Sequence, residues 1–427
     1  MILDEKLSLE RQRTAWIVLI ASFTVFTLIC ISTPVLVNAY LQNATRPLDV
    51  VVQANQGTVG IDDEAGGRRA VIVGDTGQSI VTGEHVLTGN TATALVSVRP
   101  PESDQLLASF QVYSNTDFHL LKAETPRFEV SGHGRTLVAR LDNGRIRLNV
   151  AEAAGRPFTL QLLTPQGEVL IAEPGQYAVV VRSEDKDTQV TVRSGKVDIL
   201  AAGQVLTLLP GSRGRIPTGS SPEGPLGTER NLIVNGDFSR SREQWILNPW
   251  IVELAAQPEG QVRTLDVGGE PRLNVTRQGI GHAEVSLRQV INQDVSELTS
   301  LRLLFTFRIL NETLGVCGVK GSECPLFVRV NYVDEAGASN TWQQGFYATG
   351  EVDPNLTPDI CTTCAMVQGP HIRVPAQQDY FYEIADFREE LARHGRLPPR
   401  LIESISLVFS GHGFEVEVAD VALLAEE

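Results

Sequence analysis

The sequence predicts a mainly β protein with a single transmembrane helix near its N-terminus. Short apolar runs with a period of two residues recur from about residue 53 onward, which is typical of strands. Turn dipeptides such as Asn143-Gly144 and Ser194-Gly195 separate these runs. The helix is predicted from residues 15–37, which are apolar and carry no charge.

The apolar segment is long enough to cross a bilayer. A helix of 23 residues spans ~34 Å at ~1.5 Å per residue, against ~30 Å for the hydrocarbon core. Lys6, Arg11 and Arg13 precede it and only Arg46 follows closely, so the positive-inside rule predicts a cytoplasmic tail, residues 1–14. The bulk of the chain is then extracytoplasmic, attached to the cell membrane by one span.

A cleaved secretory signal is the alternative interpretation of the same segment. Val37-Asn38-Ala39 offers the small residues that a signal peptidase requires. The apolar stretch is longer than a usual signal core, which favours an uncleaved anchor. Under either interpretation, the rest of the chain is exported across the membrane.

Composition excludes several classes of function. Hydrophobic residues make up 42% of the 427 residues and charged residues 20%, as in folded globular proteins. The formal net charge of -15 argues against nucleic-acid binding, which needs a basic surface. No common catalytic motif occurs, and none of the seven histidines stands in a metal-ligand spacing with another. The sequence therefore predicts a protein that is not an enzyme.

Changes in composition divide the extracytoplasmic part. Residues 38–52 are expected to form a short stalk, and residues 53–216 a first all-β domain. Residues 217–230, PTGSSPEGPLGTER, are rich in Pro, Gly and Ser and predict a linker. Alternating runs return in residues 231–427, together with one short charged helix that begins near Asp386. We expect this last domain to be a jelly-roll β-sandwich.

The first β domain resembles a known family. Residues 73–98 read VGDTGQSIVTGEHVLTGNTATALVSV, and residues 141–181 contain Pro-Phe before a strand, then Thr-Pro-Gln-Gly. This order of turns and strands resembles the FecR-like extracytoplasmic domain. The resemblance implies a role at the cell envelope, where such proteins sense a signal and control a sigma factor through a cytoplasmic region. A tail of 14 residues is too short for an independent domain, so we do not carry the sigma-factor role over.

The last domain resembles a second family. It opens with NLIVNGDFSRSREQW, residues 231–245, and ends with VEVADVALL, residues 416–424. These segments resemble those of galactose-binding-like carbohydrate-binding modules, in which they lie near one another. Some such modules hold a structural Ca²⁺ there, and the corresponding positions are Asn235, Asp237 and Asp420. The alternative is that these side chains bond their own backbone at turns.

Aromatic side chains are the candidates for sugar binding, because flat apolar rings stack on the C–H faces of sugars. Trp342 is the strongest candidate, since its neighbours in sequence are polar and uncharged. Packing in the core is the alternative role for each of these residues. The full set is Trp342, Trp245, Trp250, Tyr332 and Tyr347.

Four of the five cysteines lie in the last domain. An even number in an exported chain predicts disulfides, with three possible connectivities. A four-thiolate zinc site is the alternative, although C-x6-C followed by C-x2-C does not match a zinc ribbon. The four are Cys317, Cys324, Cys361 and Cys364, and Cys30 lies in the apolar segment.

Three functions follow from this organisation. The first is a membrane-anchored protein that binds a glycan or another envelope component through its last domain. The second is a transmembrane signalling component related to FecR-type regulators but without their cytoplasmic region. The third is a structural envelope protein whose last domain docks onto a protein.

Overall fold

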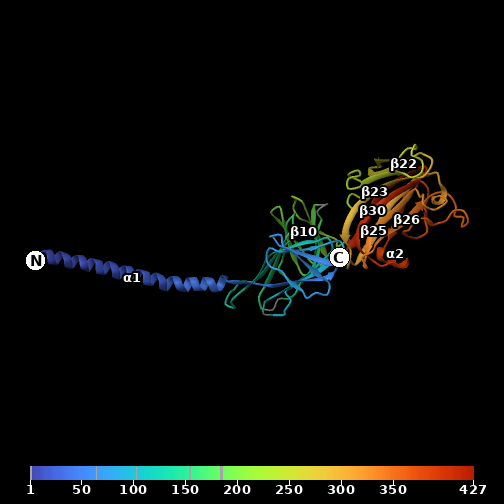
Figure 1. Ribbon diagram of the computed structural model, residues 1–427. Helices are drawn as coiled ribbons and strands as arrows, with labels where there is room; N and C mark the ends of the chain where they lie inside the picture. Colours follow the sequence, from blue (N-terminus) through green and yellow to red (C-terminus); the bar gives the residue numbers. More distant parts are fainter. Residues whose placement is uncertain (1, 64, 102, 153–154, 183–185) are drawn as a thin grey trace.

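The computed structural model describes residues 2–63, 65–101, 103–152, 155–182 and 186–427. It is mainly β, as the sequence predicts, with sandwich-like sheets and one long N-terminal helix, α1 (Ile2–Asn43). Figure 1 shows α1 projecting from one end of a first β domain, with a second β domain beyond the other end. The predicted fold class is therefore confirmed.

Helix α1 contains a stretch, Arg13–Asn43, that is long and apolar enough to cross a membrane. Only its last turns meet a β domain, where the Tyr40 ring lies edge-on to Phe128, and Trp16, Phe23 and Leu36 are each more than half exposed. So much exposed apolar surface is unfavourable in water and favourable in hydrocarbon. The helix is thus unlike the core helix of a soluble domain.

The first β domain, called the N-terminal β domain here, contains β1 to β18. These strands are connected by hydrogen bonds into one closed system. Their bounds are β1 (Thr45–Pro47), β2 (Asp49–Gln56), β3 (Thr58–Asp62), β4 (Arg68–Ile72), β5 (Gln78–Ser79), β6 (His85–Thr88), β7 (Thr93–Arg99), β8 (Ala108–Val112), β9 (Asp117–Pro126), β10 (Arg135–Val150), β11 (Phe158–Leu163), β12 (Glu168–Ile171), β13 (Gly175–Arg182), β14 (Asp187–Ser194), β15 (Val197–Ala201), β16 (Gln204–Leu208), β17 (Ser212–Pro217) and β18 (Glu223–Leu226).

Strand β10 organises this domain because it belongs to two sheets. Its first half pairs with β9 and β11, and its second half pairs with β8 and β13. Alternate residues of the strands point into one apolar core that includes Phe110, Phe118 and Leu148, all fully buried. The period of two in the sequence is therefore the pattern of this core.

The second β domain, called the C-terminal sandwich, contains two facing sheets. One has the order β21-β22-β31-β24-β29 and the other β20-β23-β30-β25-β26-β27. The bounds are β19 (Arg230–Asn231), β20 (Ile246–Ile251), β21 (Gln261–Val267), β22 (Glu270–Arg277), β23 (Ala283–Asp294), β24 (Ser300–Glu312), the 3₁₀ helix η1 (Gly315–Cys317), β25 (Leu326–Asp334), β26 (Ser339–Tyr347), β27 (Val367–Gln368), β28 (Ile372–Arg373), β29 (Tyr380–Ile384), α2 (Phe387–Arg393), β30 (Pro399–Gly411) and β31 (Phe414–Glu426).

The short helix α2 forms where the sequence predicts it. Asp386 is the N-cap, and its carboxylate accepts a hydrogen bond from the backbone N–H of Arg388. Phe387 and Leu391 are buried, and the Phe387 ring meets the Trp342 ring edge-on with centroids 5.3 Å apart. The helix therefore covers part of the sandwich core.

Two expected connectors are partly strands. The expected stalk, residues 38–52, includes the end of α1, all of β1 and the start of β2, and β1 pairs with β9. The expected linker, residues 217–230, includes β18, which pairs with β17. Polar composition does not exclude pairing at a sheet edge, where side chains on the outer face remain in water.

A buried ion pair joins the two β domains. Arg145 on β10 donates from Nε and Nη2 to the two carboxylate oxygens of Glu427, at 2.9 and 2.6 Å, and from Nη1 to the Ser296 carbonyl at 2.8 Å. The side chains of Arg145 and Glu427 are 2% and 4% exposed. Arg230, also buried, lies 3.6 Å from the same carboxylate.

The electrostatics favour the charged form of Glu427. Burial opposes its ionisation, but attraction by Arg145, Arg230 and Arg147 outweighs this and lowers the pKa of Glu427 to about 2. Polar contacts surround the pair: Arg400 donates to the Thr91 and Asn90 carbonyls, and the Tyr113 hydroxyl donates to Glu297. The domain interface is therefore held largely by charge-assisted hydrogen bonds.

Replacing Arg145 should destabilise the two joined β domains. Arg145→Met leaves Glu427 buried with less compensating charge, and we expect the free energy of unfolding to fall by about 3 kcal/mol. The measurement is urea unfolding of the full chain in detergent. Arg240→Met is the matched control, because Arg240 and Glu243 form an exposed pair and such pairs contribute ~0–1 kcal/mol. Equal losses of unfolding free energy in Arg145→Met and Arg240→Met would contradict the conclusion that the buried pair stabilises the protein more than an exposed pair does.

Candidate functional site

The outer face of the seven-stranded sheet carries an unusual number of polar side chains. Phe409, Leu407 and Val330 point into the core, so the residues between them point outward. Neighbouring strands are in register, with Arg288 opposite Ser406, Ser406 opposite Arg329, and Arg329 opposite Gln343. We call this surface the polar face, and its members are Glu284, Ser286, Arg288, Arg329, Asn331, Thr341, Gln343, Ser404 and Ser406.

Hydrogen bonds fix the side chains of the polar face. Arg329 Nε donates to Gln343 Oε1 at 3.1 Å, and Gln343 Nε2 donates to Gln368 Oε1 at 2.8 Å. In the next row, Thr341 donates to Asn331 Oδ1 and Asn331 Nδ2 donates to Ser404 Oγ. Burial lowers the pKa of Arg329, and the Glu284 carboxylate 3.9 Å away opposes this shift. Donors and acceptors are thus held in place before any ligand arrives.

One large aromatic side chain lies exposed at the edge of this face. Trp250 is on the edge strand β20, directly opposite Glu284 on β23. Opposed residues of an antiparallel pair share a face, so Trp250 is on the same side as the polar face. Its side chain is 58% exposed. An exposed ring beside fixed polar groups has the composition that sugar binding requires.

A small apolar cluster closes one end of the polar face. Phe327 and Val408 point outward and would be exposed on a bare sheet, but they are fully buried. They pack with Val316, Cys317, Cys324 and Tyr347 from the covering loops. The loops therefore hide the apolar part of the outer face. In its polar part Arg288 is exposed and Arg329 and Asn331 are partly exposed, whereas Gln343 and Ser404 are fully buried.

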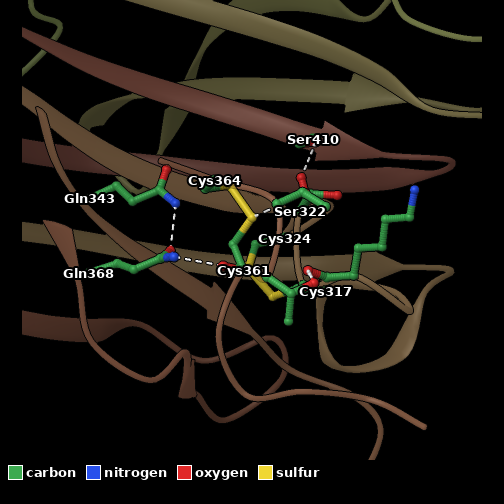
Figure 2. Close-up of a disulfide and its surroundings, with 12 residues drawn as sticks. Cys317, Ser322, Cys324, Gln343, Cys361, Cys364, Gln368 and Ser410 are labelled. Carbon is green, nitrogen blue, oxygen red and sulfur yellow. Dashed lines mark hydrogen bonds between the residues drawn. A yellow bond between two sulfur atoms is a disulfide. The ribbon is translucent and has the colours of Figure 1, made fainter. Parts of the chain in front are cut away.

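The cysteines of the covering loops form two local disulfides, Cys317–Cys324 and Cys361–Cys364. Figure 2 shows them together beside the end of the polar face, where Gln368 Nε2 donates to the Cys361 carbonyl at 2.7 Å. The disulfide prediction is confirmed, and one of its three connectivities is selected. The four-thiolate zinc alternative is wrong here, because every one of these sulfurs is bonded to another sulfur.

Four of the five aromatic candidates have no ring face to offer a ligand. Trp342 and Tyr332 are fully buried in the sandwich core, and Trp245 is 5% exposed in the same core. Tyr347 lies in the cluster under the disulfide loops. Trp342 is not available to a ligand, because alternate residues of a strand point to opposite faces. Its neighbours Thr341 and Gln343 point outward, whereas the Trp342 ring points into the core. Of the five, Trp250 alone presents its ring to solvent.

The three calcium candidates do not converge on one cation. The Asn235 side chain accepts from the backbone N–H of Arg240 and donates to the Ser241 and Glu243 carbonyls, so it organises the loop instead. Asp237 accepts from Ser239. Burial, and then the nearby Asp237 charge, raise the pKa of Asp420. Asp237 and Asp420 thus influence one another electrostatically, whereas the Asn235 side chain is engaged within its own loop.

The opening and closing segments of the sandwich do lie together. Asn231 on β19 pairs with Leu424 on β31, and the Val421 N–H donates to the Gly236 carbonyl at 3.0 Å. A Cβ on Gly236 would lie 2.0 Å from the Val421 carbonyl oxygen. Glycine is therefore required where the Asn-Gly-Asp turn crosses the last strand.

Sequence reasoning missed the polar face because its members come from strands far apart in the chain. A detectable feature was the position of Ser404, Ser406 and Ser410 between large apolar residues, Ile405, Leu407 and Phe409. Alternation of this kind predicts a polar outer face. It does not predict which other strands lie beside it.

No known family profile matches this chain, and no curated protein sequence is similar to it. Solved structures of two kinds resemble parts of it. The first kind is a protein assigned as an anti-sigma factor from Parabacteroides distasonis, 17% identical, with a TM-score of 0.21. The match covers 34% of this chain and 58% of that protein.

The second kind is carbohydrate-binding modules of Clostridium thermocellum. A family 11 module, solved with a mixed-linked tetrasaccharide, is 11% identical over 46% of this chain and 94% of its own, with a TM-score of 0.27. The family 22 module of Xyn10B is 13% identical over 45% and 96%, with a TM-score of 0.25. These are the two classes that the sequence resembles, but TM-scores this low carry no functional argument.

Peptide mapping tests the disulfide assignment. Proteolysis of the unreduced protein should give two cross-linked species, one joining Cys317 to Cys324 and one joining Cys361 to Cys364. The Cys317→Ser/Cys324→Ser variant should lose about 2 to 3 kcal/mol of unfolding free energy, the entropy expected for so short a loop. Mass spectrometry of the peptides reads the pairing. Peptides linking the two loops, or four free thiols, would contradict it.

Proposed function

We propose that this protein is anchored in a membrane by α1 and binds a glycan on the polar face of its C-terminal sandwich. The observation that supports the proposal is the exposed ring of Trp250 on the same sheet face as side chains already fixed by hydrogen bonds. A sugar offers hydroxyls to such groups and a C–H surface to such a ring. Binding, not catalysis, is the proposed activity.

Fixed polar groups make a glycan a better fit than an apolar partner. Arg329 and Asn331 are partly exposed on the outer side of the sheet, and each is held by a hydrogen bond to a fully buried side chain, Gln343 or Ser404. Ordering such groups costs no side-chain entropy on binding, since the protein has already ordered them. A hydrophobic ligand would leave their remaining donors and acceptors unpaired.

The anchoring part of the proposal rests on α1 and its flanking charges. The most apolar part of the helix is unburied, and the basic residues Lys6, Arg11 and Arg13 lie on its N-terminal side. By the positive-inside rule we propose that this end is cytoplasmic. The polar face then lies outside the cell membrane.

The test is binding of the full chain in detergent to a panel of purified polysaccharides. Because Asp237 and Asp420 lie close together, binding is measured with Ca²⁺ and again with a chelator. Trp250→Ala should weaken binding about tenfold or more, since the ring is lost while the fold is not. The control is Phe381→Ala, because Phe381 is 59% exposed on the opposite sheet.

Two results would count against a glycan site. Equal affinity of wild type and Trp250→Ala would show that the polar face does not bind the sugar. Failure of a folded protein to bind any glycan would favour the remaining alternative, a protein partner docked on the sandwich. Capture of a membrane protein partner through α1 would instead favour a signalling role.

A further inference from the structure

Two histidines that are distant in sequence meet on the outer surface of the N-terminal β domain. His85 on β6 lies directly opposite His119 on β9, and their ring centroids are 4.4 Å apart. Val86 and Phe118, the next residues along, are fully buried in the core. The two imidazoles therefore share the outward face of neighbouring strands.

Carboxylates complete the cluster. Asp117 precedes His119 by two residues and so lies on the same face, and Asp142 comes from the adjacent strand β10. Asp117 Oδ1 lies 3.1 Å from His85 Nδ1 and 3.0 Å from His119 Nε2. Asp142 Oδ2 lies 3.1 Å from the same Nε2. Two ring nitrogens and one Asp117 oxygen thus lie within 4.8 Å of one another, and the Asp142 oxygen lies beside His119.

Hydrogen bonds do not explain the position of the His119 ring. Its Nε2 is buried, and among the described residues it makes no hydrogen bond, because neither nearby carboxylate lies in a suitable direction. A nitrogen this close to two anionic oxygens, with no hydrogen bond to either, has the surroundings of a metal ligand. In a tetrahedral zinc site with bonds of about 2.0–2.1 Å, the ligand atoms lie roughly 3.3 Å apart.

The second nitrogen of His85 supports the same interpretation. His85 Nδ1 faces Asp117, whereas Nε2 faces the Asp62 carboxylate on β3 at 4.0 Å. Metal-binding histidines commonly direct their other nitrogen at a carboxylate, which fixes the ring and the tautomer. Asp62 is itself paired with Arg68, so it is held in place on the far side of the ring.

We propose that His85, Asp117 and His119 form a binding site for a divalent transition-metal ion such as Zn²⁺, and that Asp142, beside His119, moves toward the ion as a fourth ligand. Imidazole nitrogens with carboxylate oxygens suit zinc and its neighbours in the first row, whereas Ca²⁺ and Mg²⁺ prefer oxygen ligands alone. The side chains are between 18% and 37% exposed, so an ion can reach them from solvent.

The Arg140 guanidinium lies beside the proposed site and would compete with a metal ion for Asp142. Arg140 Nε lies 3.1 Å from Asp142 Oδ2, and its Nη2 lies 3.5 Å from His119 Nδ1. Its side chain is 43% exposed, so it can turn into solvent when an ion takes the carboxylate. An ion bound here would link β6, β9 and β10, and the stability of the N-terminal β domain would then rise with metal concentration.

Spacing in the sequence does not reveal this histidine pair. They are 34 positions apart in sequence, and only the pairing of β6 with β9 joins them. The detectable sequence feature was Asp117-Phe118-His119, since in a strand the first and third of these side chains share a face.

The test is calorimetric titration of the metal-free full chain in detergent with zinc chloride. We expect one equivalent to bind with a dissociation constant in the micromolar range or below. The His85→Gln/His119→Gln variant should bind about a hundredfold more weakly or not at all, and Asp62→Asn about tenfold more weakly. His133→Gln is the control, because His133 is exposed in the same domain and outside the cluster.

Thermal unfolding gives a second readout that does not depend on heats of binding. Saturating zinc should raise the Tm of the wild type and of His133→Gln but not that of the double variant. Zinc binding that persists in a folded double variant would overturn the proposal, as would absence of binding to the wild type. If the double variant does not fold, unchanged affinity in Asp62→Asn and His85→Gln would overturn it equally.

Discussion

The buried contact between Arg145 and Glu427 sets how the two β domains meet. A carboxylate can be this deeply buried only when cations compensate it, and Arg145 and Arg230 approach it from the N-terminal β domain and from the first strand of the sandwich. Tyr113 and Arg147 extend the contact to Glu297. The position of the polar face relative to α1 depends on this interface.

Helix α1, the proposed metal site and the proposed glycan site lie in three successive parts of the molecule. Figure 1 shows α1 at one end, the N-terminal β domain in the middle and the sandwich at the other end. The proposed metal site lies in the middle domain and the proposed glycan site in the distal one. A ligand on the sandwich therefore binds far from α1, and a rigid interface at Arg145 would keep that distance constant.

Much of the fold was predictable, because period-two apolar runs and turn dipeptides are local signals. Helix α2 was predictable from its N-cap Asp386 for the same reason. The binding surfaces were not, since they depend on which strands pair. Trp342 and Trp250 illustrate the difference: polar neighbours favoured Trp342, but its ring faces the core, and only the position of β20 at the sheet edge exposes Trp250.

The buried pair of Arg145 and Glu427 predicts that the two β domains form one rigid unit. This prediction is tested most directly by double electron–electron resonance between spin labels on exposed Val205 and Phe381, one in each domain, with the free Cys30 replaced by Ser. We expect a single narrow distance distribution in the wild type and a broadened one in Arg145→Met. A broad distribution in the wild type would contradict the account, because the domains would then move independently.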